Sequence, residues 1–347
     1  MILCRSTYYK SVPWLRPSDS QKADSFTLEL YVWTGLKSAV PASPQYSKTV
    51  FNVESLSTTL DVEIGKLIQD FVPDEVVTSN VTEVLDGKNS VWVQHQVKYD
   101  VAGDITTELV VTDFATNGYG YGNEGKNYAP TKTLLTDTEE VDADNNSFVQ
   151  VPVLLSEVDP TRIEVKAGAT VLLAADLAAT TDSDAIVSVI NIKCKDALER
   201  DLITVVTDSG DEYCIFLRDE SKHNPVDVQF LNRYGHLQTL TFFKERTDDL
   251  EVMGEMYERR LGQPSDGRHQ FVEFGKNGQS TFKLSTGYLE ESVNTLVKEF
   301  LLSEFYWISG EPVNLTTTSQ TFQTRLNSKV VAYTMEFKYS YKEINMV

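Results

Sequence analysis

A glycine-rich segment carries the first residue spacing that could do chemistry. The glycines of residues 120–125 match G-x-G-x-x-G, which binds a dinucleotide phosphate where a strand turns into a helix. Here the following residues 126–130, KNYAP, open a helix poorly. We therefore interpret residues 117–130 as a loop rich in Tyr and Gly. Because Tyr gives contact area at little entropic cost, Tyr119 and Tyr121 are candidate interface residues.

Two further patterns resemble metal sites, and both fall short. Residues 142–146 imitate the start of a calcium loop, but Ser147 stands where the sharp turn needs Gly, and Val153 where the loop needs Glu. An acidic turn is the simpler interpretation. The histidines have no zinc-binding spacing to each other or to cysteine; they are His95, His223, His236 and His269. We predict no metal site and no cofactor.

Motifs for nucleophilic or phosphoryl-transfer catalysis are absent from the sequence. Carboxylate pairs such as Glu139-Glu140 and Glu290-Glu291 are frequent, but adjacency means little in an acidic chain. Glycoside hydrolases place their two carboxylates through the fold and without a fixed spacing, so this class stays a third hypothesis. We predict no catalytic residues and a protein that is not an enzyme.

Charge and cysteine content limit the kinds of partner and the cell compartment that can be expected for this chain. The 347 residues have a formal net charge of −20, which repels nucleic-acid phosphates and anionic membranes. We expect no membrane span, since no apolar stretch is long enough, and residues 1–14 lack the features of a secretory signal. Cys4, Cys194 and Cys214 are too few for a disulfide framework, which favours synthesis in a reducing host cytoplasm.

Alternation of apolar and polar residues predicts a mainly β protein. Clear runs lie at residues 26–33 and 331–341. Turn residues inside longer runs predict hairpins over residues 91–112, 202–217 and 226–243. Short strands separated by turns are typical of β-sandwiches.

A few short amphipathic helices are expected between the strands. Apolar residues at helical spacing predict a helix over residues 64–71 and another over residues 289–300. The spacing of Leu250, Met253 and Tyr257 also predicts a helix, over residues 247–261.

The chain is longer than a single core of roughly 250–300 residues, so two or three β-sandwich-like domains are expected. We place an N-terminal β-rich domain with one helix at residues 1–130. A middle β-sandwich-like domain follows at residues 131–245, and a C-terminal α+β domain at residues 246–347. The polar residues 131–146 are the expected link between the first two.

The final strand has an aromatic face, on which Tyr333, Phe337, Tyr339 and Tyr341 follow one another at period two. The strand either completes its own sheet, which we favour, or extends the sheet of a neighbouring molecule. These four aromatic residues join Tyr119 and Tyr121 as candidate interface residues, because aromatics are enriched at interfaces.

Three passages form the last signal in the sequence. They are FTLELYVWTG at residues 26–35 with YSK at 46–48, FLNRYGHLQTLTFF at 230–243, and residues 301–308 with 331–340. Together they resemble virion structural proteins of tailed bacteriophages, especially tail or baseplate subunits of phages of Bacteroidetes-type hosts. None is a catalytic signature. The most specific is Asn232-Arg233-Tyr234-Gly235, a turn between two aromatic strands.

The resemblance implies a structural subunit of a phage tail or baseplate that acts by packing against other subunits. Its expected partners are copies of itself in a ring or other symmetric assembly, together with other virion proteins, and its expected location is the virion tail. The alternative hypothesis is a carbohydrate- or receptor-binding module of a virion or cell surface, which would use exposed aromatic side chains.

Overall fold

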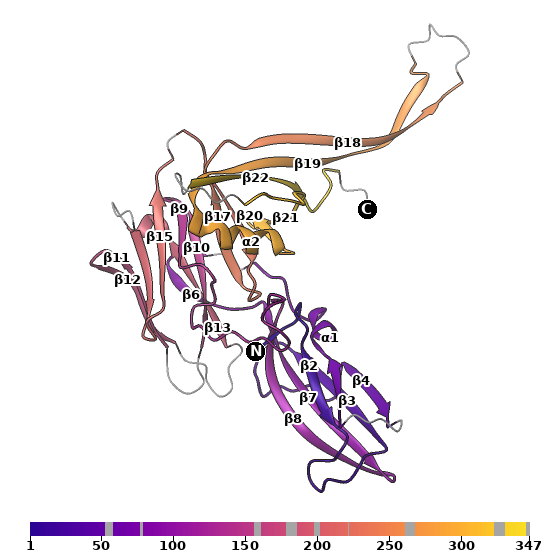
Figure 1. Cartoon of the computed structure of the whole chain (residues 1–347). Helices are drawn as coiled ribbons and strands as arrows, with labels where there is room; N and C mark the ends of the chain where they lie inside the picture. The colour runs from indigo at the N-terminus through magenta and orange to yellow at the C-terminus, as the bar shows by residue number, and fades with distance from the viewer. Residues whose placement is uncertain are drawn as a thin grey trace.

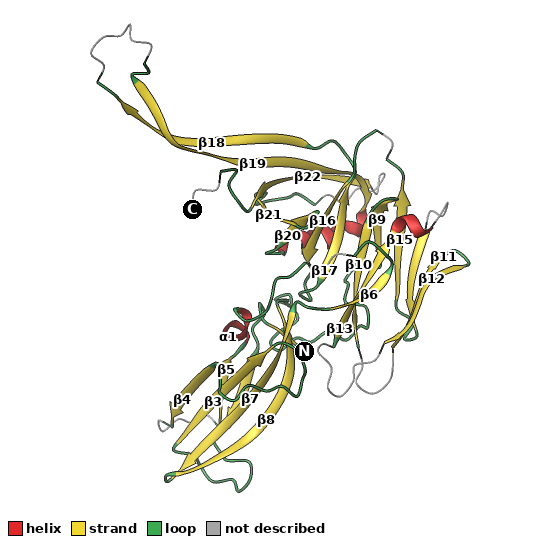
Figure 2. Cartoon of the chain, turned by 180° about the vertical axis from the view of Figure 1, so that it is seen from behind, coloured by secondary structure: helices red, strands yellow, loops and turns green. Residues whose placement is uncertain are grey.

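Figure 1 shows a computed structural model of the chain, in which an elongated molecule carries a long hairpin at one end. The structure describes residues 1–52, 58–76, 79–155, 161–177, 186–197, 202–220, 222–260, 268–322 and 330–344. Strands dominate, and the described helices are short (Figure 2). The mainly β, sandwich-like fold predicted from the sequence is therefore confirmed.

The N-terminal end of the molecule is a five-stranded sheet in the order β1-β8-β7-β3-β4. Its strands are β1 (Ile2–Leu3), β3 (Ser25–Trp33), β4 (Tyr46–Phe51), β7 (Ser90–Val101) and β8 (Asp104–Thr116). The alternating run at residues 26–33 and the hairpin at 91–112 are thus confirmed. Register places buried apolar residues of β3 opposite buried apolar residues of β7, as Phe26 faces Tyr99 and Leu28 faces Val97.

A second, smaller layer covers one face of this sheet. It consists of β2 (Tyr9–Pro13), β5 (Thr59–Glu63) and α1 (Gly65–Gln69), the helix predicted over residues 64–71. Val12 and Ile64 from this layer share a buried core with Phe26 and Leu28 of β3. The N-terminal end is therefore a sandwich in its own right.

The middle of the molecule is a second sandwich. One sheet has the order β10-β13-β6 and the other β12-β11-β14-β15-β9. Their bounds are β6 (Glu83–Asp86), β9 (Glu140–Asp144), β10 (Phe148–Leu154), β11 (Thr161–Ala167), β12 (Thr170–Leu177), β13 (Val187–Lys193), β14 (Leu202–Thr207) and β15 (Glu212–Arg218), with a short 3-10 turn at Cys194–Ala197. Valines and isoleucines of both sheets share one core.

A seven-stranded sheet completes the fold, in the order β17-β16-β20-β21-β22-β19-β18. Its strands are β16 (Val226–Leu231), β17 (Leu237–Phe242), β18 (Thr247–Glu258), β19 (Phe271–Glu290), β20 (Tyr306–Ile308), β21 (Glu311–Leu315) and β22 (Val330–Tyr339). The final strand β22 pairs with β19 and β21, so it completes its own sheet as favoured from the sequence.

Helix α2 (Asn294–Leu302) packs on this sheet after a 3-10 turn at Glu291–Val293. The ring of Phe300 lies 5.0 Å from Phe230, 5.9 Å from Phe242 and 6.1 Å from Phe337. These contacts bury the apolar face that predicted a helix over residues 289–300, and a helix is found there with a later start.

The sheets do not follow the three sequence segments proposed as domains. Strand β6 comes from residues 1–130 but pairs with β13 in the middle sandwich. The seven-stranded sheet takes β16 and β17 from before residue 245 and the rest from after it. Residues 131–146, expected to be a link, include β9, which pairs in parallel with β15. Strand pairing joins segments distant in sequence, which local composition does not reveal.

The helix predicted over residues 247–261 is wrong, because this segment is strand β18. Leu250, Met253 and Tyr257 do lie at helical spacing, but β18 pairs with β19 along its whole length, with an irregularity beside Gly254. The long antiparallel partner overrides the weak local preference.

His236 lies in the turn between β16 and β17 and is 1% exposed. Neither of its ring nitrogens has a hydrogen-bond partner within the described residues. Burial lowers the pKa of His236 from 6.5 to about 3. The folded chain therefore excludes a proton that the unfolded chain accepts below pH 6.5.

We expect His236 to make the protein less stable as the pH falls below 6.5. Its contribution is complete above that pH and declines toward pH 3 by about 1.4 kcal/mol per pH unit. Urea unfolding at a series of pH values measures this slope. In a His236→Leu variant the slope should fall by the amount that one bound proton contributes. Equal slopes in the parent and the variant would contradict the assignment.

Candidate functional site

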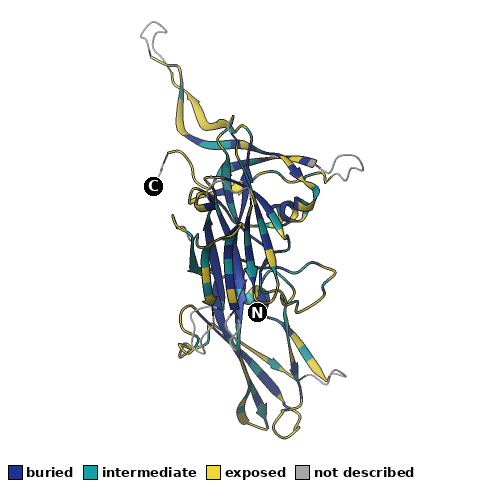
Figure 3. Cartoon of the chain, turned by 90° about the vertical axis from the view of Figure 1, so that its left-hand side faces the viewer, coloured by how far each residue is buried: buried dark blue, intermediate teal, exposed yellow. Residues whose placement is uncertain are grey.

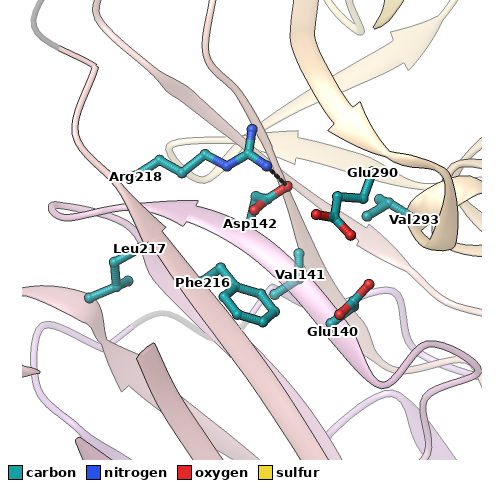
Figure 4. A pocket seen from close by; sticks show the side chains of 8 residues that line it. All are labelled: Glu140, Val141, Asp142, Phe216, Leu217, Arg218, Glu290 and Val293. Atoms are coloured by element: carbon teal, nitrogen blue, oxygen red, sulfur yellow. Dashed lines mark ion pairs between the residues drawn. The ribbon is translucent and has the colours of Figure 1, made fainter. Parts of the chain in front are cut away.

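Two surface pockets have charged or polar groups in their linings. The smaller, about 240 Å³, lies beside the parallel β9–β15 pair (Figure 4). Arg218 Nη2 lies 2.7 Å from Asp142 Oδ2, and Glu140 and Glu290 stand nearby. Burial raises the pKa of Asp142, with Arg218 acting in the opposite direction. We interpret this ion pair as a structural tie between the middle of β9 and the end of β15.

The larger pocket, about 530 Å³, lies between β16 and the β10–β13 sheet. Its central carboxylate, Asp227, accepts hydrogen bonds of 2.7 Å from the hydroxyls of Ser147 and Thr241. Gln229 Nε2 donates to Gln150 Oε1 at 2.9 Å. Asp227 and Gln229 thus have polar partners on neighbouring elements, as buried polar groups in a structural contact do, whereas Asn191 Oδ1 in the same lining has no hydrogen-bond partner among the described residues.

Neither a metal centre nor a membrane segment emerges from the part of the chain that the structure describes. No cluster of three or more His, Cys, Asp or Glu residues there is arranged to hold a metal ion. No described helix combines the length and apolar character needed to cross a bilayer.

The strongest candidate for a functional surface is the hairpin that projects from the seven-stranded sheet. Strand β22 pairs with β19 only between Thr281 and Glu290, so residues 271–280 of β19 extend beyond it. The strand that they pair with there is β18, and at the base Asn277 and Gly278 also hydrogen-bond to Ile344 and Glu343. We call residues 250–258 and 271–280 the arm. Figures 1 and 3 show it leaving the body of the molecule, and most of its residues are exposed except at the base, where Asn277 and Gly278 are buried.

The arm exposes apolar side chains to an unusual degree. Every residue of β18 is exposed. A two-stranded ribbon is normally stable only when its apolar side chains pack against further strands or a second layer. The large apolar side chains of the arm and their exposures are Leu250 58%, Val252 58%, Met253 47%, Met256 63%, Tyr257 43%, Phe271 57% and Phe274 46%.

Both faces of the arm carry apolar side chains. Period two places Leu250, Val252 and Met256 on one face and Met253 and Tyr257 on the other. Tyr257 contacts Phe274 across the ribbon, with ring centroids 5.6 Å apart. Exposed apolar side chains gathered in this way make the arm the candidate interaction surface.

A second unit, which we call the joint, holds the N-terminal sandwich against the rest of the molecule. At its centre is Arg233, 3% exposed, in the turn between β16 and β17. Its two terminal nitrogens contact Asp137 Oδ2 at 2.6 Å and both carboxylate oxygens of Glu124 at 2.7 and 2.8 Å. Tyr121 and Tyr128 lie 4.5 and 4.9 Å from the guanidinium carbon.

The charge of Arg233 is paired in the joint, although Arg233 Nε and Glu299 Oε1 have no hydrogen-bond partner among the described residues. Burial alone opposes the charge of Arg233, but the hydrogen bonds to Glu124 and Asp137 hold its pKa above the ordinary value. Tyr234 donates its hydroxyl to Asp137 Oδ1 at 2.7 Å. Burial, with Asp137 next to it, raises the pKa of Glu299, which favours the neutral acid.

Two glycines make the close approach in the joint possible. Gly235 has φ +79°, and a Cβ there would lie 2.8 Å from the backbone nitrogen of Asn117. A Cβ on Gly118 would lie 2.5 Å from the carbonyl oxygen of Arg233. The backbones can therefore meet, and Tyr119 N donates to Arg233 O at 2.7 Å.

The six interface candidates from the sequence lie in the body of the molecule and not on the arm. Tyr119 is buried, and Tyr121 stacks on Arg233 in the joint. Tyr333 and Phe337 are buried in the core of the seven-stranded sheet, while Tyr339 is half-buried and Tyr341 is 45% exposed. A role for these six between subunits stays a prediction.

The arm was not predicted from the sequence. The helical spacing of apolar residues in residues 247–261 predicted a helix there, although the same segment also alternates as a strand does. Residues 271–290 give the missing signal, since a long strand-like run needs a partner of matching length.

Comparisons with family models, with curated proteins and with solved structures find no match to this chain.

Loss of the Arg233 side chain should destabilise the whole molecule. In Arg233→Ala, Glu124 and Asp137 would stay partly buried without their partner, at a cost of about 3–5 kcal/mol in the free energy of unfolding. Arg233→Lys should restore only part of this, since one ammonium group cannot bind both carboxylates as a guanidinium fork does. Urea unfolding measures all three proteins.

Arg162→Ala is the matched control, because Arg162 pairs with Glu164 at 3.0 Å on the surface. We expect it to change the free energy of unfolding by less than about 1 kcal/mol. If Arg233→Ala cost no more than this control, the joint would not hold the two parts together.

Proposed function

We propose that this chain is a structural subunit of a symmetric protein assembly, and that the assembly is the tail or baseplate of a phage particle. The observation that carries the proposal is the arm, whose large apolar side chains named above are 43–63% exposed in the described parts of the molecule. The resemblance of residues 26–48, 230–243 and 301–340 to tail and baseplate subunits supports the placement in a virion.

The energetics favour association through the arm. Full burial of one large apolar side chain contributes about 1.5–3 kcal/mol, and the arm side chains have roughly half of that left to gain. The sum over the arm reaches the lower part of the estimated 4–15 kcal/mol that association costs in rigid-body freedom. Further contacts, such as strand pairing, must therefore add to the apolar burial.

The carbohydrate-binding alternative depends on exposed aromatic platforms. All four tryptophans, the best sugar-stacking residues, are at most 8% exposed; they are Trp14, Trp33, Trp92 and Trp307. Trp14 packs on Phe26 and Trp92 on Phe114, with ring centroids 4.9 and 5.0 Å apart. These side chains serve the cores, so we retain the assembly function.

Polar substitutions on the arm should abolish assembly without unfolding the subunit. In a Leu250→Ser, Met256→Ser, Phe271→Ser variant, we expect the urea midpoint to stay within the error of the parent, since these side chains are exposed in the single chain. Light scattering should show the parent as a multiple of 39.0 kDa and the variant as a single chain.

An Ile105→Ser, Val110→Ser variant is the control, because these residues of β8 are also exposed, at 67% and 52%. It should assemble like the parent. A parent that stays at 39.0 kDa at every concentration, and is absent from purified particles of its source, would refute the proposed function.

A further inference from the structure

We propose that the arm of one copy pairs, through its β18 edge, with the β4 edge of the N-terminal sheet of the next copy. This inference deepens the proposed function, since it names which two surfaces of the chain meet. It rests on edge geometry, on charge and on the positions of the two strands in the molecule.

Strand β18 presents an open edge. It is the last strand of the seven-stranded sheet, and its pairing partner is β19 on one side. The backbone N–H and C=O groups on its other side are available to a further strand. β18 has five carboxylates and no basic residue; the carboxylates are Asp248, Asp249, Glu251, Glu255 and Glu258. A complementary edge must therefore be basic or at least free of acid.

Strand β4 meets this requirement. It is the last strand of the N-terminal sheet on its side and pairs with β3. Residues 30–52, which include β4, contain Lys37 and Lys48 and no Asp or Glu. Lys48 is exposed in the middle of β4, and Phe51 at its end is 70% exposed. The edge thus offers a cation and an apolar contact to an acidic, apolar strand.

Three other strands at sheet edges fit the arm less well, because they carry acid themselves. β6 has Glu83 and Asp86, and β12 has Asp176. β8, which meets β1 only at its last residues, has three carboxylates: Asp104, Glu108 and Asp113. Like charges placed opposite each other across a strand pair are destabilising, so the charge pattern favours β4 over these three strands.

Lys48 gives the contact its specificity. A lysine on an edge strand is a common protection against uncontrolled pairing, since a neutral strand docked there would desolvate its charge. Glu251 or another acid of β18 would neutralise the same lysine. The edge is therefore closed to neutral strands and open to an acidic one.

The position of the two edges makes the contact head-to-tail. The arm leaves one end of the molecule, and the N-terminal sheet forms the other (Figures 1 and 2). A surface at one end that binds a different surface at the opposite end is heterologous, and repeats into a ring or an open filament. Every copy would then supply one arm and one β4 edge.

Cross-linking between two distinguishable copies tests the contact directly. One full-length copy carries Glu251→Cys and a short affinity tag, and the other carries Thr49→Cys in β4. Both have Cys214→Ser, since Cys214 is only half-buried whereas Cys4 and Cys194 are buried. After mixing, a short bismaleimide should join tagged to untagged copies in high yield. Val171→Cys on β12, 50% exposed, replaces Thr49→Cys in the control and should give little product.

Charge reversal tests the electrostatic part. Lys48→Glu should raise the concentration for half-assembly by about tenfold or more, because it sets like charges against each other. A chain that combines Lys48→Glu with Asp249→Lys, Glu251→Lys and Glu255→Lys places opposite charges on the two edges again. It should restore assembly toward that of the parent. Urea unfolding of each variant verifies that the subunit is folded.

The outcomes separate this inference from the proposed function. If the parent assembles but Thr49→Cys gives no more product than Val171→Cys, and Lys48→Glu assembles normally, the β4 contact is wrong while the structural function stands. If the parent does not assemble, the proposed function itself fails. Efficient β4 cross-linking with rescue by the reversed charges establishes the contact.

Discussion

The arm sets the constraint on which this account depends. Two antiparallel strands are marginally stable in water unless something covers them, and here both faces carry large apolar side chains. The cores of the molecule are filled by their own contacts. Phe300 packs at the centre of the aromatic core of the seven-stranded sheet, and the middle sandwich is filled by valines and isoleucines. Single apolar side chains are exposed elsewhere, as Phe51 and Ile105 are, but the arm carries seven of them on one projecting element.

The joint gives that projection a defined direction. Arg233 pairs with Glu124 on the N-terminal side and Asp137 at the start of the middle sandwich, and Gly118 and Gly235 let the backbones touch. Arg5 adds a further tie, donating to the carbonyl of Leu302 at 2.8 Å. A subunit that must place its two ends at fixed positions in an assembly gains from such a rigid centre, because ordering costs are met before binding.

Much of the local structure could be predicted from the sequence, and the long-range pairing could not. The runs at residues 26–33 and 226–243 alternate with period two and fold as strands, and the turn Asn232-Arg233-Tyr234-Gly235 lies where its residue types indicate. Arg233 looked like a turn residue, since nothing local shows that Glu124 and Asp137 converge on it. Tyr121 was assigned to an interface between copies, and the fold places it in a contact within one copy.

Hydrogen–deuterium exchange, followed by mass spectrometry over a range of protein concentrations, tests the central claim most directly. As the mass of the particles rises above 39.0 kDa, the amides of residues 250–258 and 46–51 should become protected together. Exchange in both segments that stays as fast in the assembly as in the single chain would contradict the account.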